Sequence, residues 1–281
     1  MRQPHTSLRA GILAAIRSRN DATDATALTA QDGKAVIASY NIHKCVGTDK
    51  RFDPDRIIDV ICEIDADIIA LQEADQRFGE RAGLLNLDRL RDECRLLPVP
   101  ITAHSEKGHA WHGNVLFFRE GVVKDVHQLR LPGIEPRGAL VVDLDLAAGP
   151  LRIIAAHFGL LRHSRAQQAA AIVAALDAAE DKPTLLMGDL NEWRLGTRSS
   201  LRWLSPRFDP EVATVPSFPS RFPVLALDRV MGSPHNLVES VEVHNTPTAR
   251  VASDHLPIKA HVDLNRAMAF FDTMPDTVVA S

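Results

Sequence analysis

The chain has 281 residues, an apolar fraction of 45%, a charged fraction of 24% and a formal net charge of −4. This composition is ordinary for a globular protein, and the length suits one large domain or two small ones. The slightly acidic balance argues against a broad basic face that grips long nucleic acid, and no apolar run reaches the length of a transmembrane helix.

Residues 1–33 differ in composition from the rest of the chain. The segment 20–30 is rich in Asp, Thr and Ala with little to bury, so we predict a flexible N-terminal segment. Before it, apolar residues recur at helical spacing among several arginines. One interpretation is a membrane-surface helix within residues 1–19, and the other is a loosely docked tail. We expect residues 34–265 to form the main domain and residues 266–281 a C-terminal tail.

The main domain alternates between strand-like and helix-like segments. Asp53 followed by Pro54 is the pattern of an N-cap and a first-turn proline, and apolar residues follow at helical spacing, so a helix is predicted over residues 54–64. A second helix is predicted over residues 165–180. The predicted strands are residues 36–42, 67–72, 115–119, 140–146, 151–157, 184–188, 227–231 and 257–262. This mixture of hairpin-like and helix-separated strands indicates a layered α/β fold.

The three cysteines, Cys45, Cys62 and Cys94, lack the close spacing of a metal site. We therefore predict reduced thiols packed inside a cytoplasmic protein. The absence of a secretory pattern at the N-terminus agrees with that expected location.

Four short motifs place acidic or amide side chains at the ends of apolar runs. They are SYNIH with Asn41, IIALQEAD with Glu73, MGDLNEW with Asp189 and Asn191, and SDHLPI with Asp254 and His255. Such runs are typical of buried strands, and carboxylates gathered at the rim of a sheet are costly unless a cation meets them. Hard oxygen ligands without Cys select Mg²⁺, Mn²⁺ or Ca²⁺ rather than zinc. The pattern therefore predicts a site for a divalent cation.

In this order, the motifs resemble those of the endonuclease/exonuclease/phosphatase superfamily, which includes DNase I, exonuclease III, the sphingomyelinases and the inositol polyphosphate 5-phosphatases. The resemblance runs from about residue 36 to about residue 262, and SYNIHKCVG and HFGLLR are similar to a subgroup of small bacterial members. It implies a DNase I-like four-layer α/β/β/α sandwich with the active cleft at one edge. It also implies a Mg²⁺-dependent hydrolase of phosphoester bonds, with Mn²⁺ as an alternative cofactor.

The resemblance assigns the metal to three of the motif residues. Glu73 would be the principal ligand, and Asp254 would supply a second carboxylate. Asn41 would position Glu73 or a metal-bound water without adding negative charge.

The resemblance assigns the chemistry to five further residues. Asp189 would orient or activate the attacking water, or hold a second cation, and Asn191 would hydrogen-bond a phosphoryl oxygen. Two residues apart in an extended chain, their side chains project the same way. His255 would act on the phosphate or the nucleophilic water, with its tautomer fixed by Asp228 of the LDRV segment. His157 would contact the scissile phosphate.

Three more residues are candidates for binding the substrate phosphate. Asn114, in HGNVLFF, resembles the amide that binds a phosphate oxygen beside the cleft. Arg137 in EPRGAL and Arg162 in HFGLLR are candidate phosphate forks, because a guanidinium matches phosphate bidentately. The alternative for both arginines is an ordinary surface position.

Fold and catalytic residues alone do not select the substrate. The low aromatic content of 5% and the lack of a dense Lys/Arg run favour a small or lipid-like phosphoester over nucleic acid. The alternative is a DNA or RNA nuclease of the same fold, and the alternative of another class is a catalytically inactive binding module. A nuclease would use a local basic cleft at Arg77, Arg81, Arg137 and Arg162. The sequence indicates no obligate protein partner and leaves the number of metal ions and the oligomeric state open.

Overall fold

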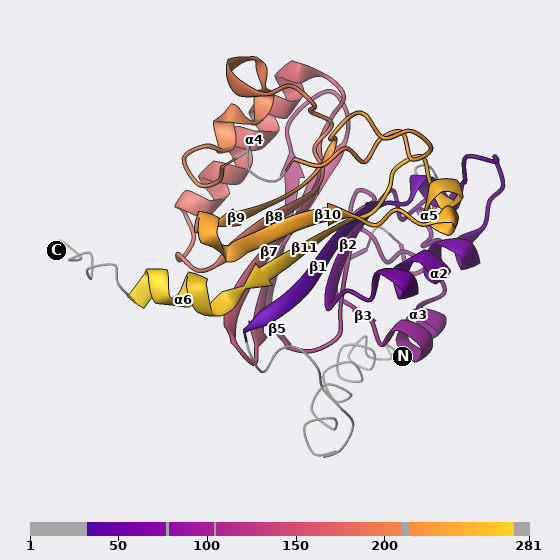
Figure 1. Ribbon diagram of the computed structural model, residues 1–281, viewed down its shortest axis with the longest axis horizontal. Coiled ribbons are helices and arrows are strands. Elements are labelled where there is room, and N and C mark those ends of the chain that lie inside the picture. Colours follow the sequence, from indigo (N-terminus) through magenta and orange to yellow (C-terminus); the bar gives the residue numbers. More distant parts are fainter. Residues whose placement is uncertain (1–32, 77–78, 104, 210–213, 273–281) are drawn as a thin grey trace, which may run out of the picture.

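The structure is a computed structural model that describes residues 33–76, 79–103, 105–209 and 214–272. The predicted membrane-surface helix within residues 1–19, nearly all of the predicted flexible segment, the end of the predicted C-terminal tail and Arg77 lie outside these residues. Figure 1 shows two β-sheets packed face to face with helices on both outer faces. The predicted four-layer α/β/β/α sandwich is confirmed.

The first sheet has six strands in the order β10-β11-β1-β2-β4-β3. Its central strand β1 runs parallel to β2 and antiparallel to β11. The strands are β1 (Lys34–Asn41), β2 (Ile68–Gln72), β3 (Leu97–Pro98), β4 (Val115–Phe118), β10 (Val238–Val243) and β11 (Ile258–Asp263). An apolar cluster joins its outer face to the covering helices, which are α2 (Pro54–Ile64), α3 (Leu87–Cys94) and α5 (Pro247–Ala252).

The second sheet has five strands in the order β5-β6-β7-β8-β9. Only the β7–β8 pair is parallel, and the helix α4 (Arg162–Asp177) makes that crossover. The strands are β5 (Val122–Leu131), β6 (Arg137–Leu146), β7 (Gly149–His157), β8 (Thr184–Asp189) and β9 (Asp228–Ser233). The outer face is covered by α4 and by the 3₁₀ helix η4 (Ser200–Leu204).

The main core lies between the two sheets. Ile37 and Leu116 from the first sheet meet Val142, Ile153 and Met187 from the second, and all five side chains are fully buried. Burial of each such side chain contributes about 1.5–3 kcal/mol relative to leaving it in water. The core therefore fixes how the sheets face each other and, with them, the strand ends that bear the motif residues.

The helix predicted over residues 54–64 is confirmed as α2, and its ends have clear local causes. The side chain of Asp53 accepts a hydrogen bond from the backbone N–H of Arg56 at 3.0 Å, and Pro54 occupies the first turn, where no donor is needed. The helix stops at Asp65, which has a left-handed backbone with φ of 55°. The second predicted helix begins three residues earlier than expected and ends at Asp177.

The remaining elements of the described residues are short. They are the 3₁₀ helices η2 (His43–Cys45), η3 (Gly196–Arg198) and η5 (His235–Leu237) and the helix α6 (Leu264–Asp272). Ala267 of α6 is buried in the core between the sheets. No helix among the described residues has both the length and the apolar composition that crossing a bilayer requires.

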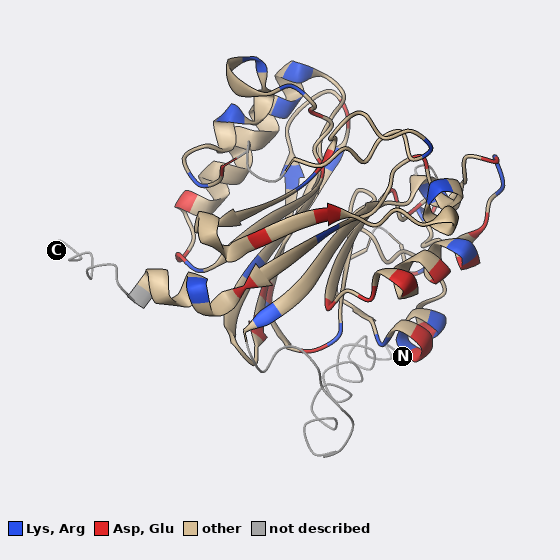
Figure 2. Ribbon diagram, in the orientation of Figure 1, with Lys and Arg blue, Asp and Glu red and all other residues tan. Residues whose placement is uncertain are grey.

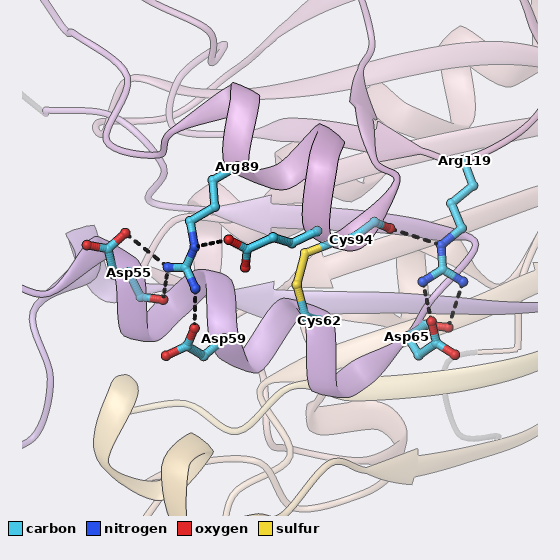
Figure 3. The surroundings of a disulfide bond; sticks show 8 residues. Asp55, Asp59, Cys62, Asp65, Arg89, Cys94 and Arg119 are labelled. Atoms are coloured by element: carbon cyan, nitrogen blue, oxygen red, sulfur yellow. Dashed lines mark hydrogen bonds and ion pairs between the residues drawn. A yellow bond between two sulfur atoms is a disulfide. The ribbon is translucent and has the colours of Figure 1, made fainter.

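The prediction of three reduced thiols was wrong for two of them. Cys62 of α2 and Cys94 of α3 form a disulfide, shown in Figure 3, whereas Cys45 is a buried free thiol. The two bonded residues are 32 apart in sequence, so spacing along the chain gave no sign of the pairing. Packing of α2 against α3 brings their Cα atoms to 5.1 Å, within the range that a disulfide needs.

Candidate active site

Three catalytic candidates form one row across the second sheet. The register pairs His157 at the end of β7 with Asp189 at the end of β8, and Asp189 with Asp228 at the start of β9. Residues opposite each other on neighbouring strands project from the same face. All three side chains are almost fully buried. We call these three residues the catalytic row.

Asp189 is the centre of the site. Its Oδ2 atom accepts a hydrogen bond from Nδ2 of Asn41 at 3.0 Å and lies 3.5 Å from Nε2 of His157 and 3.7 Å from Nε2 of His255. Its Oδ1 atom accepts from the backbone N–H of Asn191 at 3.0 Å. Burial raises the pKa of Asp189 above its ordinary value, and the hydrogen bonds and His255 only partly oppose this. One carboxylate therefore faces donors from both sheets.

His255 is held from behind by Asp228. Nδ1 of His255 lies 2.8 Å from Oδ2 of Asp228, and the hydroxyl of Ser217 donates to the same oxygen. This pairing puts a proton on Nδ1 and directs Nε2 toward Asp189. Burial alone would lower the pKa of His255, but the charges of Asp228 and Asp189 raise it. The structure thus brings together the His–Asp pair that the sequence suggested.

His157 is oriented by an arginine. Nη1 of Arg137 donates to Nδ1 of His157 at 2.9 Å, and Glu135 fixes the guanidinium through bonds of 3.1 Å from Nε and 2.8 Å from Nη2. Because an arginine can only donate, Nδ1 is an acceptor and the ring proton lies on Nε2, which faces Asp189. The structure therefore places Arg137, a predicted phosphate ligand, beside the catalytic row.

Asn191 reaches the row through a constrained loop. Its backbone has φ of 52°, and its Nδ2 atom donates to the carbonyl of Phe158 at 3.0 Å. Nearby, Gly188 has φ of 141°, and a Cβ atom there would lie 1.8 Å from the carbonyl oxygen of Ala156. Only glycine permits this approach of β8 to β7. The loop thus ties the end of β8 to the chain that follows β7.

The carboxylates of Glu73 and Asp254 lie outside the catalytic row and are more exposed. Glu73 follows β2, and its side chain forms an ion pair with Lys44 of η2. Oδ1 of Asp254 lies 3.7 Å from Nδ1 of His43, also in η2. Burial would raise the pKa of Glu73, but the ammonium group of Lys44 lowers it below its ordinary value. Each of these two carboxylates therefore already faces a basic side chain.

Among the described residues, one group of His, Asp and Glu side chains has ligand atoms close enough together to hold a divalent cation, and neither Glu73 nor Asp254 belongs to it. Ligand atoms of Asp189, Asp228 and His255 lie within 4.8 Å of one another. The predicted ligands Glu73 and Asp254 supply partly exposed carboxylates, and carboxylate and amide oxygens suit Mg²⁺ or Mn²⁺. The oxygen of the predicted amide ligand, Asn41, accepts from the backbone N–H of His43 at 3.0 Å. The donor set is chemically suited to a hard cation.

The two remaining phosphate candidates occupy different surroundings. Asn114 is fully buried, and its Nδ2 atom donates to the carbonyls of Trp111, His112 and Gly138 at 3.0–3.4 Å. Arg162 is the first residue of α4 and is exposed. Phosphate binding by either residue stays a prediction.

Sequence reasoning missed a buried ion pair that supports the Asn191 loop. Oε2 of Glu192 accepts from Nη2 of Arg165 at 3.1 Å and from the hydroxyl of Ser200 at 2.7 Å. Burial would raise the pKa of Glu192, but the hydrogen bonds from Ser200 and its other donors lower it to about 2. Glu192 thereby joins the end of β8 to α4 and η4. The only signal in the sequence was an acidic residue directly after Asn191.

Comparison with known proteins gives concordant matches. The family model described as the Endonuclease/Exonuclease/phosphatase family matches residues 38–255. Uncharacterized protein YbhP of Escherichia coli (strain K12) is 26% identical over 255 residues, which cover 81% of this chain and 96% of YbhP. The superfamily resemblance inferred from the four motifs is confirmed by the family match.

Solved structures share the fold. An endonuclease/exonuclease/phosphatase from Beutenbergia cavernae DSM 12333 has a TM-score of 0.63 at 21% identity, over 82% of this chain and 72% of that one. TDP2 of D. rerio, complexed with single strand DNA product, has a TM-score of 0.61 at 15% identity, over 82% of this chain and 99% of that one. At such identities the likeness concerns the fold alone.

Proposed function

Because the chain belongs to the endonuclease/exonuclease/phosphatase family, we propose that it hydrolyses a small or lipid-like phosphoester with the help of Mg²⁺. Members of the family are hydrolases that act on phosphoester bonds. The observation that carries the proposal is the catalytic row with His255, in which one buried carboxylate faces two imidazole nitrogens and an amide. Burial raises the pKa of this carboxylate, and a buried carboxyl group with a raised pKa beside two histidines is typical of functional sites.

In this mechanism, Asp189 and His255 orient and activate the attacking water. Asp228 holds Nδ1 of His255 and helps to keep the ring protonated, so His255 presents an Nε2–H toward Asp189 and the attacking water, and Asp189 is the group that can accept a proton. Such general acid–base help is worth on the order of 10²–10⁴-fold in rate. Asp228 acts as a positioning residue, since it touches His255 rather than the substrate.

The opposite side of the row stabilises the charge that develops on the phosphoryl group. His157 presents an Nε2–H, because Arg137 occupies its other nitrogen. Asn191 contributes its side-chain amide from the loop after β8. A donor held in place before the reaction costs no reorganisation when the charge appears, and removing one such donor typically costs 10²–10³-fold in turnover.

Glu73, Asp254 and Asn41 would hold the Mg²⁺ ion, and Mn²⁺ suits the same ligands. When bound, the metal supplies Lewis-acid polarisation of a phosphoryl oxygen. The ion pair between Glu73 and Lys44 supports this assignment, because it indicates that positive charge is favoured beside Glu73.

The choice of a small or lipid-like substrate rests on charge and composition. The net charge of −4 gives little general attraction for nucleic acid. A nuclease is the second candidate, because TDP2 of D. rerio, which shares the fold, was solved with a single strand DNA product. An inactive binding module is disfavoured, because the buried row and its positioning groups are intact.

A cytoplasmic location stays a prediction. The Cys62–Cys94 disulfide argues against it, because cytosolic reductants keep most thiols reduced in mesophiles. Alkylation of thiols in freshly lysed cells, followed by mass analysis of the two cysteines, would show whether the bond is present in the cell, and free thiols there would support the cytoplasmic prediction.

The proposed function is tested by hydrolysis of bis(p-nitrophenyl) phosphate and p-nitrophenyl phosphate, beside supercoiled plasmid and phospholipid vesicles, with Mg²⁺, Mn²⁺ or EDTA. Asp189→Asn should lose turnover by at least about 10²-fold. Glu120→Gln, which neutralises an exposed carboxylate, is the matched control and should retain it. Turnover that survives EDTA, or that is equal in Asp189→Asn, would overturn the proposal. Preferential nicking of plasmid would favour the nuclease.

A further inference from the structure

Exposed apolar side chains occur in the two chain segments that follow β7 and β8. Trp193, Leu195 and Trp203 lie in the chain between β8 and the end of η4, and they are 46%, 54% and 49% exposed. Leu160 and Leu161, 65% and 49% exposed, lie between β7 and α4. We call these five residues the tryptophan rim. Both segments follow the strand ends that carry His157 and Asp189.

The two segments of the rim are joined by buried contacts. Nη1 of Arg165 donates to the carbonyl of Leu160 at 2.5 Å, while its Nε and Nη2 atoms donate to Ser200 and Glu192. Arg194 and Arg202 line the same open pocket of about 330 Å³, together with Leu195. Buried hydrogen bonds of Arg165 therefore hold the two segments of the rim together, and the pocket forms a recess beside Leu195.

Positive charge accompanies these apolar side chains. The guanidinium of Arg194 lies 4.3 Å from the ring centroid of Trp193, and that of Arg202 lies 5.4 Å from the ring centroid of Trp203. Residues 193–203 contain three arginines and no acidic residue, in a chain whose net charge is −4. Figure 2 shows several Lys and Arg positions around α4 at the top of the view. Two acidic residues reduce this positive charge: Asp209 also lines the recess, and Oε1 of Glu192 accepts a hydrogen bond from Nη1 of Arg194 at 3.3 Å.

This combination matches the boundary region of a lipid bilayer. Tryptophan favours the headgroup level, where its ring is apolar and its N–H stays wet. Each arginine near an anionic membrane surface contributes about 1 kcal/mol of attraction. Single-stranded nucleic acid would also use stacked Trp and Arg side chains, but it offers no apolar phase for Leu160, Leu161 and Leu195. The three exposed leucines favour the bilayer.

We propose that the tryptophan rim docks the protein on an anionic phospholipid surface, with the arginines against lipid phosphates and the Trp and Leu side chains in the headgroup and acyl boundary. Trp193 lies two residues after Asn191, and Leu160 lies three residues after His157. Docking therefore brings the catalytic row to the membrane surface. This inference rests on the proposed function in naming the substrate class, which is a phospholipid headgroup ester. The rim is separate from the predicted contact through residues 1–19.

The test is binding to vesicles of phosphatidylcholine alone or mixed with phosphatidylglycerol, measured by cosedimentation in EDTA. The wild-type protein should bind the anionic vesicles more tightly, with a blue shift of tryptophan emission and weaker binding at high salt. Trp193→Ser/Trp203→Ser should weaken that binding by at least about tenfold. Leu195→Asp, a second variant on an exposed position, should weaken it as well. Phe270→Ser on α6 removes an aromatic of similar exposure outside the rim and should bind like wild type.

The outcomes separate docking from catalysis. Asp189→Asn should bind vesicles like the wild type, because this residue is outside the rim. If the wild-type protein binds vesicles but hydrolyses no phosphoester, the proposed function is refuted and the docking proposal is not. Rim variants whose circular dichroism is native and whose vesicle binding is unchanged would overturn the docking proposal. Loss of oligo(dT) binding in the rim variants, with vesicle binding unaffected, would overturn it in favour of nucleic acid.

Discussion

Reduction of the Cys62–Cys94 disulfide should lower the free energy of unfolding by about 3.7 kcal/mol. The estimate follows from loop-closure entropy, since the bond joins two residues that are 32 apart in the unfolded chain. Figure 3 shows Arg89 bridging α3 to Asp55 and Asp59 of α2 beside the disulfide. Exposed ion pairs of this kind are each worth about 1 kcal/mol or less, so they do not replace the covalent link.

The assay is equilibrium unfolding in urea, followed by far-ultraviolet circular dichroism with and without dithiothreitol. The double variant Cys62→Ala/Cys94→Ala should match the reduced wild type and should not respond to the reductant. Cys45 stays in both proteins, so any effect of the reagent on the free thiol appears equally in each.

Two results would refute this reasoning. One is an unfolding midpoint that dithiothreitol leaves unchanged in the wild type. The other is a count of three reactive thiols in the denatured, unreduced protein, because the disulfide leaves one free thiol, at Cys45.

Three further predictions concern the site. The raised pKa of His255 should add to the free energy of unfolding, measured in EDTA, in full below pH 6.5, the ordinary pKa of histidine, and this contribution should be lost as the pH rises through the raised pKa. Asp228→Asn should shift that loss to lower pH, because it removes a charge that raises the pKa. An unshifted pH profile would contradict the pairing of the two residues. Lys44→Met should raise Mg²⁺ affinity in calorimetry by about tenfold, since no ammonium competes for Glu73, and unchanged affinity would count against that competition. Gly188→Ala should cost about 3 kcal/mol or more in urea unfolding, because its Cβ would meet a carbonyl oxygen of β7; a wild-type midpoint would argue against that close approach.

Buried strands were predictable from the sequence, including the edge strand β9, whereas the exposed edge strands β5 and β10 were not. The runs that became β2 and β8 are fully buried and apolar, so hydrophobicity alone identified them. β5 and β10 lie at sheet edges with mostly exposed or half-buried side chains, and their polar composition hid them. The short helix α3 was missed as well, since eight residues give little periodicity.

Within the site, the sequence suggested the motif residues and the pairing of His255 with Asp228, but not the other partners of these residues. Asp189 and His255 stand in recognisable motifs, whereas the contacts of Arg137 with His157 and of Lys44 with Glu73 depend on side-chain positions after folding. Residues 43–45 adopt positive φ angles, and no local sequence pattern predicts this backbone conformation. The sequence likewise held no sign of the Cys62–Cys94 pairing, because it arises from helix packing.

The strand register of the second sheet determines the spacing of the three residues in the catalytic row. Neighbouring strands lie about 4.8 Å apart, so the row from His157 through Asp189 to Asp228 spans roughly 10 Å, a distance set by backbone hydrogen bonds. The rim residues, in contrast, lie in segments that leave the sheet. Under the proposed function, substitutions in the rim would change membrane docking, while the spacing of the catalytic row would stay fixed by strand pairing. The fold would thereby place docking and hydrolysis on structurally independent parts of the chain.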